Sequence, residues 1–177
     1  MGQCALMADR PTSTDFETWF ADLTADVTAE RRALVRPWFA SLHAQHGPVT
    51  SAVASVAWAL TRLNVAELAV ALTLADVQRT TSWQPDVELS ISDNAVEISV
   101  DGHTRAPATM ADPWDDATIV CDIAEIIQED TSEWNSEVWP SCDRHGVGLH
   151  AEVKARRAVW WCSKGEHVVS EIGMLGA

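Results

Sequence analysis

The sequence predicts an α+β protein in which a helical N-terminal half is followed by a β-hairpin, a helix and a small C-terminal β module. Three observations lead to this prediction. Apolar residues recur at helical spacing as far as residue 80, and the period changes to two at Asp86. Two pairs of cysteine and histidine then lie near the C-terminus. We therefore expect a flexible tail at 1–12, a helical region at 13–80 and a second unit at 85–177.

The composition allows one domain with a real core, or a helical region with a small appended module. The chain has 177 residues, of which 47% are hydrophobic. Arginine and alanine dominate over lysine, which suggests a GC-rich bacterial genome. The first seven residues lack the basic start and apolar stretch of a secretory signal. The four cysteines also fit a reducing compartment, so we expect a cytoplasmic protein.

Capping residues mark the expected N-terminal helices. Thr14 and Glu17 form a capping box that starts the first helix. Thr28 can cap a second helix, within which Pro37 predicts a kink or a restart. Gly47 followed by proline ends that helix and opens the next.

Two apolar runs, 49–63 and 68–77, predict a helical pair with almost no polar side. Such helices are buried in a bundle or in an oligomer interface, and a homodimer through Trp58 is the sharper alternative. Three polar residues interrupt the region 52–75, so we expect no membrane span. His43 and His46 lie three apart on a helix and could bind metal, but solvated histidines at a helix C-terminus are the favoured interpretation.

A β-hairpin is predicted after Asp86. Val87, Leu89 and Ile91 alternate with polar residues, Asp93-Asn94 makes the turn, and 96–100 returns with the same alternation. A second turn at Asp101-Gly102 allows a third short strand through Arg105.

The last helix is expected to start at Asp112 as the N-cap, with Pro113 in the first position. Its buried stripe and its acidic side follow from helical spacing: the stripe is Ile119, Val120, Ile123, Ile126, Ile127 and Trp134, and the acids are Asp122, Glu125, Glu129 and Glu133. Cys121 falls on the acidic side, where an exposed thiol would have its pKa raised. A carboxylate metal site at Glu125 and Glu129 is a weaker alternative to a solvated face.

Nearly all of the net charge of −14 lies in one segment. Residues 85–139 hold 14 acids and one base, Arg105, whereas 140–177 hold 4 acids and 5 bases. Such a segment repels nucleic-acid phosphates and suits either a basic protein partner or a solvated face.

The C-terminal cysteines and histidines have the spacing of a metal site. Cys142 and His145 form one pair, and Cys162 and His167 form the other after a sixteen-residue spacer. Such ligands suit a tetrahedral Zn²⁺, and four protein ligands leave no open position, so the ion would be structural. Reduced core cysteines or a disulfide are the alternatives. His150 could substitute as a ligand, but its place in the middle of a strand favours an ordinary surface residue.

The segment around these pairs resembles a zinc ribbon. Gly146 follows a Cys-x2-His knuckle and can adopt positive φ. Two strand-like runs, 149–154 and 158–161, are joined by a turn at 155–157, and a third strand is possible at 167–173. Two positions that zinc ribbons usually fill with cysteine hold histidine here, and the second pair is separated by four residues. The order of hairpin, helix and ribbon over 87–173 also resembles short actinobacterial proteins of unassigned function.

The sequence lacks a phosphate-binding loop, a dinucleotide fingerprint, a Gly-x-Ser-x-Gly motif and a His-Glu-x2-His helix. We therefore expect a non-enzymatic interaction or adaptor protein whose acidic face, 86–137, binds a basic partner. One alternative is nucleic-acid binding through the ribbon, by Arg144, Lys154, Arg156, Arg157, Lys164, Trp160 and Trp161. Another is an acidic mimic of nucleic acid. The sequence leaves the roles of Cys4 and Cys121 open.

Overall fold

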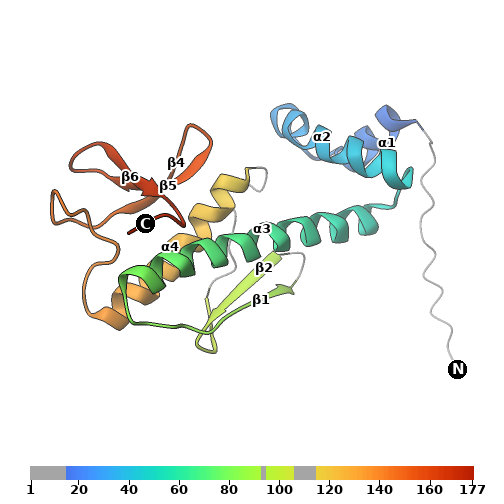
Figure 1. Cartoon of the computed structure of the whole chain (residues 1–177). Helices are drawn as coiled ribbons and strands as arrows, with labels where there is room; N and C mark the ends of the chain where they lie inside the picture. Colours follow the sequence, from blue (N-terminus) through green and yellow to red (C-terminus); the bar gives the residue numbers. More distant parts are fainter. Residues whose placement is uncertain (1–14, 93–94, 106–114) are drawn as a thin grey trace, which may run out of the picture. The chain divides into compact units, whose positions relative to one another are not determined.

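The computed structural model describes residues 15–92, 95–105 and 115–177 (Figure 1). Helices fill the N-terminal half, and a three-stranded sheet, a helix and a second three-stranded sheet follow, so the predicted α+β class is confirmed. The chain divides into two compact units, Met1–Trp58 and Ala59–Ala177. The tail expected at 1–12 lies outside the described residues.

The first unit contains α1 (Phe16–Leu23), α2 (Ala29–His46) and the start of α3 (Ser51–Thr80). The N-cap of α1 is Asp15, whose carboxylate accepts the Thr18 backbone N–H at 3.2 Å. The predicted N-cap, Thr14, is therefore wrong by one residue and lies outside the described residues. Thr28 caps α2 as predicted, and Gly47 ends it at a φ of +70°. Pro37 lies within the span of α2.

Aromatic rings form the core of the first unit. Trp19 is 2% exposed, contacts the Phe39 and His43 rings at 5.7 and 5.1 Å between centroids, and donates its indole N–H to the carbonyl of Val49 at 2.8 Å. Because His43 packs between helices, the expectation that it is a solvated histidine is wrong. Trp58 meets Trp38 edge to face at 4.8 Å within the chain. The homodimer through Trp58 stays a prediction.

The helix α3 is continuous over 30 residues, where the sequence predicted two helices. The polar residues between the apolar runs are compatible with helix, so they do not break it. Burial of these helices in a bundle within one chain is also wrong, because Val53, Val56, Leu60 and Leu68 are all more than half exposed, and burial in an oligomer interface stays a prediction. By length and composition alone, α3 could cross a membrane. Its last turns hold the buried, charged Asp76, and the absence of a membrane partner stays a prediction.

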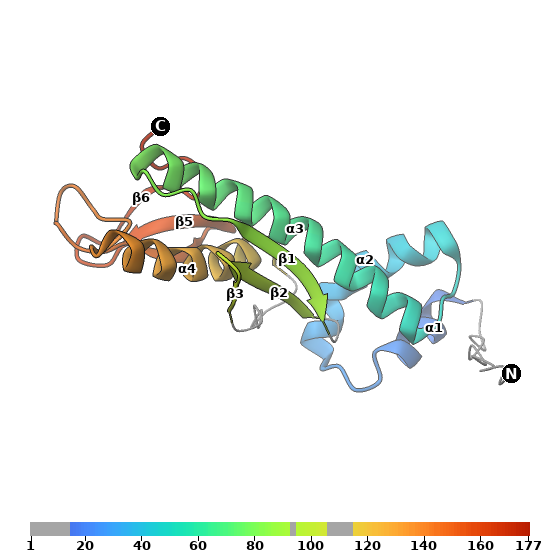
Figure 2. The ribbon, with the colours of Figure 1, turned by 90° about the horizontal axis from the view of Figure 1, so that it is seen from below.

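The second unit places two helices between two antiparallel sheets (Figure 1). One sheet has the order β1 (Val87–Ser92), β2 (Ala95–Val100), β3 (His103–Thr104), and the other has the order β4 (His150–Lys154), β5 (Arg157–Cys162), β6 (His167–Glu171). The helices are the second half of α3 and α4 (Asp116–Asn135). Viewed from below, β1–β3 lies in front of the helices and β5 behind them (Figure 2). The predicted turn at Asp93-Asn94 lies outside the described residues, but Ser92 pairs with Ala95 as a two-residue hairpin loop requires.

The core of the second unit follows the alternation in the sequence. Val96, Ile98 and Val100 of β2 are at most 2% exposed, and they belong to one cluster with Ile119, Ile123 and Ile127 of α4. The start of α4 was predicted too early: its N-cap is Asp115, and Asp112 and Pro113 lie outside the described residues.

Two predicted orientations on α4 are wrong. Trp134 is 50% exposed because it lies in the last turn, beyond the core, where it stacks on Trp83 at 6.0 Å. Cys121 is only 6% exposed, because α4 is covered by β4 and β5 on that side. The Cys121 pKa is raised to about 12, as its predicted direction requires, but burial is the main cause and the carboxylates of Glu125 and Asp122 add to it.

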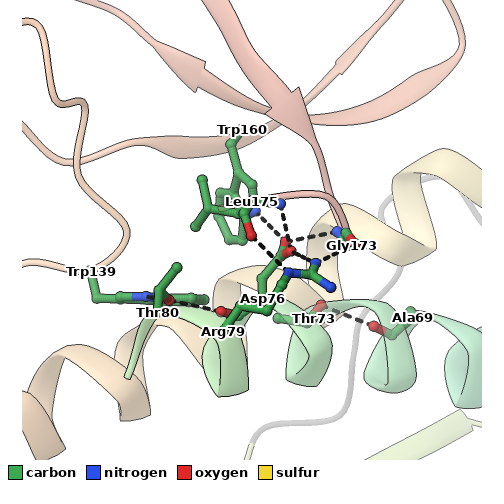
Figure 3. Close-up of polar contacts among 9 residues, drawn as sticks. All are labelled: Ala69, Thr73, Asp76, Arg79, Thr80, Trp139, Trp160, Gly173 and Leu175. Atoms are coloured by element: carbon green, nitrogen blue, oxygen red, sulfur yellow. Dashed lines mark hydrogen bonds and ion pairs between the residues drawn. The ribbon is translucent and has the colours of Figure 1, made fainter. Parts of the chain in front are cut away.

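A buried carboxylate on α3 fixes the C-terminal end of the chain (Figure 3). Asp76, which is fully buried, accepts the indole N–H of Trp160 at 2.8 Å and the backbone N–H groups of Gly173 and Leu175 at 2.7 Å each. Arg79 pairs with the same carboxylate at 2.7 Å and donates to the Gly173 and Leu175 carbonyls. Every oxygen of this buried charge therefore has a partner, as a buried carboxylate requires. No sequence pattern predicted this network.

The next turn of α3 holds the segment that leads to the first cysteine. Thr80 donates its hydroxyl to the Asp76 carbonyl at 2.7 Å and accepts the Trp139 indole N–H at 2.8 Å (Figure 3). Trp139 and Trp160 precede Cys142 and Cys162 by a few residues and contact each other at 5.5 Å. The segment that carries Cys142 and the segment that carries Cys162 are therefore both anchored on α3.

Candidate metal centre

The first Cys/His pair lies in a tight knuckle. The carbonyl of Cys142 accepts the backbone N–H groups of His145 and Gly146 at 3.1 and 2.7 Å, and the Cys142 N–H donates to the Val147 carbonyl at 2.8 Å. Gly146 has a φ of +62°, as predicted from its place after the second ligand. These bonds turn the thiol of Cys142 and the ring of His145 toward the same point.

The second pair lies on neighbouring strands. Cys162 ends β5, His167 starts β6, and the two are paired in register. The turn between them requires Gly165 for space, because a Cβ there would lie 2.2 Å from Cε1 of His145 and 2.6 Å from Nδ1 of His167. Real Cβ contacts are essentially never under 3.0 Å, so both imidazoles close over this glycine. Sequence reasoning missed Gly165, although a glycine between two candidate ligands was a visible signal.

The four side chains converge, as the sequence predicted for Cys142, His145, Cys162 and His167. Their ligand atoms all lie within 4.8 Å of one another. Nδ1 of His145 is 3.4 Å from Sγ of Cys142 and 3.3 Å from Sγ of Cys162, and Nε2 of His167 is 3.7 Å from Sγ of Cys142. Zinc bonds of about 2.1 Å to nitrogen and 2.3 Å to sulfur give tetrahedral edges of roughly 3.5 Å. The cluster is therefore compatible with a four-coordinate metal ion.

The surroundings of Cys142 favour its thiolate, the form that binds metal. Both sulfurs are buried, with Cys142 2% and Cys162 0% exposed, and both cysteines are free of a disulfide. Burial alone would raise the pKa of Cys142, but hydrogen bonds from the backbone N–H groups of Arg144 and His145 and from the Cys162 thiol outweigh burial and lower it. Two soft sulfurs and two imidazoles form a donor set that suits zinc.

The other metal candidates do not come together in the described part of the chain. His150 is exposed on β4 and is not a member of the cluster. Neither His43 with His46 nor Glu125 with Glu129 belongs to a group of three or more converging ligands among the described residues.

The aromatic residues proposed for nucleic-acid stacking are engaged elsewhere. Trp160 is fully buried and hydrogen-bonded to Asp76, so no base can reach it. Nζ of Lys154 lies 4.2 Å from the ring of Trp161. Arg157 pairs with Glu171 and Lys154 pairs with Glu152, which offsets much of the positive charge of this sheet.

The acidic segment keeps most of its carboxylates at the surface. Glu125, Glu129 and Glu133 are exposed at successive turns of α4, and Asp86, Glu88 and Asp101 are exposed on or beside the first sheet. Asp122 differs from the prediction, because it is half-buried and burial raises its pKa. The pKa of Glu125 is also raised, first by burial and then by Glu129.

No protein-family model, curated protein or solved structure matches the chain. The assignment of the Cys/His cluster as a candidate metal site therefore depends on its geometry alone. The resemblance to actinobacterial proteins stays a prediction.

Proposed function

We propose that this chain is a non-enzymatic protein-interaction or adaptor protein, in which a structural zinc ion stabilises the C-terminal module and an acidic face binds a basic partner. The observation that carries the proposal is the closed cluster of Cys142, His145, Cys162 and His167. Four protein ligands fill a tetrahedral zinc, so no position remains for water or substrate. A metal held in this way supplies folding energy rather than chemistry.

The acidic face supports the binding half of the proposal. Glu125, Glu129 and Glu133 repeat at i, i+4 on the exposed side of α4. Like charges at this spacing destabilise a helix by about 0.2–0.5 kcal/mol per pair, so the fold does not benefit from this row. A basic partner would neutralise it and gain the same interactions as binding energy.

The metal half is tested by elemental analysis of protein purified without added metal. We expect one zinc per chain, and we expect Cys142→Ser and Cys162→Ser to lose it. Protein that folds without any stoichiometric metal would refute the structural ion. A different metal at the same stoichiometry would refute zinc alone.

The acidic face is tested by capture of basic proteins at about 50 mM and 500 mM salt, because screening weakens exposed charge pairs. We expect capture at low salt only, and we expect loss of capture when Glu125, Glu129 and Glu133 are all changed to glutamine. The matched control changes three exposed acids elsewhere, Asp22, Glu30 and Glu67, to their amides. Equal capture at both salt concentrations would rule out recognition by this face. Equal loss of capture in the two triple variants would also rule it out.

A further inference from the structure

A cleft of about 400 Å³ opens between the first sheet and the last turns of α4. Two tryptophans, Trp83 and Trp134, line it together with Asp101, Asp130, Glu133 and Arg105. All of these residues lie within the unit Ala59–Ala177. The lining of the cleft therefore combines aromatic rings with carboxylates.

The aromatic part of the lining is a stack of two indole rings, of which one is buried and one is exposed. Trp83 is 7% exposed, and Trp134 is 50% exposed. Their ring centroids lie 6.0 Å apart with an interplanar angle of 18°. Trp83 supports Trp134 from inside, so the exposed surface of Trp134 is held in a fixed orientation at the cleft.

The free charge of the cleft is negative. Arg105 and Asp130 neutralise each other, because Nε of Arg105 donates to Oδ2 of Asp130 at 3.1 Å and a second bond joins Nη2 to Oδ1. The remaining carboxylates, Asp101 and Glu133, are both exposed, and the exposed imidazole of His103 also lines the cleft. One oxygen of Asp101 accepts the Asp86 backbone N–H at 2.8 Å, which fixes that carboxylate. Glu133 also ends the acidic row of α4, so the cleft is continuous with the proposed binding face.

We propose that this cleft binds the guanidinium group of an arginine in a basic partner segment, stacked on Trp134 and paired with Glu133. A cation over a tryptophan face is attracted by the ring, and the planar guanidinium both stacks and forms two parallel bonds to a carboxylate. The base of a nucleic acid would also stack, but the phosphates of its backbone would be repelled by the surrounding acids. The inference rests on the proposed function, since the neighbouring basic residues would contact the row Glu125, Glu129 and Glu133.

The larger described cleft offers no such surface. It has a volume of about 480 Å³ and lies beside Trp139, Val169 and Met174. Its tryptophan is only 6% exposed and donates its indole N–H to Thr80. An arginine there would find carboxylates without an open aromatic face.

The test is fluorescence anisotropy with a labelled peptide of alternating arginine and glycine, with the lysine analogue as a second probe. We expect the arginine peptide to bind more tightly, and we expect Trp134→Ala to weaken it on the order of tenfold, with recovery in Trp134→Phe. Trp134 is half exposed, so the variants should fold, which the melting temperature checks. Glu133→Gln should weaken binding more than Glu129→Gln, which removes the same charge from the same helix outside the cleft.

The outcomes separate this inference from the proposed function. Salt-sensitive binding that is the same in wild type and Trp134→Ala overturns the cleft and leaves the acidic face intact. Equal losses in Glu133→Gln and Glu129→Gln also overturn the cleft, because they show diffuse attraction. Absence of binding to the wild type at low salt overturns both.

Discussion

The two sheets of the second unit share a three-stranded antiparallel order, yet different interactions hold them. In β1–β3 the inner side chains of β2, Val96, Ile98 and Val100, are almost fully buried. In β4–β6 several apolar side chains face outward: Val153, Val168 and Val169 are 37–44% exposed. Both sheets also bury apolar side chains, since Val159 and Trp160 of β5 are at most 3% exposed, so burial alone does not distinguish them.

The second sheet adds polar contacts and a Cys/His cluster to its buried core. Trp160 of β5 and the backbone of Gly173, after β6, are hydrogen-bonded to Asp76. Cys162 and His167, at the two ends of the β5–β6 turn, belong to the converging Cys/His cluster. A metal bound by this cluster would contribute folding energy to the sheet. The same sheet order can thus be encoded by alternation alone or by alternation together with a few polar contacts.

Metal removal should have the largest effect, and it should affect the second sheet. Structural zinc contributes about 10–16 kcal/mol of apparent binding energy in small modules. We expect chelation, or Cys162→Ser, to lower the melting temperature by more than about 10 °C. Hydrogen exchange should rise over β4–β6 and much less over β1–β2. Chelator should have no further effect on Cys162→Ser, and an unchanged melting curve in the wild type would contradict the prediction.

Asp76→Ala should have the next largest effect. It leaves Arg79 without its carboxylate and removes the acceptor of Trp160, Gly173 and Leu175. Loss of one partner of a buried pair costs about 3–5 kcal/mol. Denaturant unfolding measures it, with Glu67→Ala, an exposed acid on the same helix, as the control. Equal stability of the two variants would show that Asp76 does not anchor the tail.

Ile98→Ala should weaken the first sheet without disturbing the ligands. Ile98 is fully buried on β2, and such truncations cost about 2–5 kcal/mol. We expect the stability to fall and the zinc content to stay constant. The control is Ile91→Ala on β1, which is 40% exposed and should cost less than half as much. Loss of zinc in Ile98→Ala would mean that the two sheets are not held independently.

The sequence predicted the first sheet because its strands alternate and its turns carry Asp-Asn and Asp-Gly. It also predicted that Cys142, His145, Cys162 and His167 would converge, because their spacing is typical of a metal site. Local signals of this kind need only neighbouring residues. The turn predicted at 155–157 is confirmed at Ala155 and Arg156, both of which have positive φ, whereas Arg157 already belongs to β5.

The errors came from features that depend on distant packing. The carboxylate of Asp76 is more than eighty residues away from Trp160, so no local pattern shows that they meet. Cys121 was placed on a polar face because its helix neighbours are acidic, but β5 covers it. Trp134 fitted the buried stripe by spacing, yet the core ends one turn earlier. Periodicity gives the face of a helix and does not show where the covering element stops.

Gly165→Ala should have a smaller effect, limited to the metal site. The added Cβ would press on the His145 and His167 rings, and overpacking of this kind costs about 1–3 kcal/mol. We therefore expect zinc affinity to fall by roughly tenfold to a hundredfold, measured by competition with a chromophoric chelator. Ser163→Ala, at an exposed position in the same turn, is the matched control. Unchanged affinity in Gly165→Ala would mean that the rings do not close over this residue when metal binds.

Ionisation of the Cys121 thiol should have the smallest effect on the free energy of unfolding, and this effect should appear only at high pH. Burial raises the pKa of its thiol from 9.0 to about 12, so the folded state keeps the proton that the unfolded chain releases. The contribution to stability is fully present below about pH 9 and is lost as the pH rises toward 12. We expect the unfolding free energy to decline over this window, and less steeply in Cys121→Ala. A thiol reagent at about pH 8 should leave Cys121 unmodified in the folded protein. Modification as fast as in denaturant would show that β5 does not cover this residue.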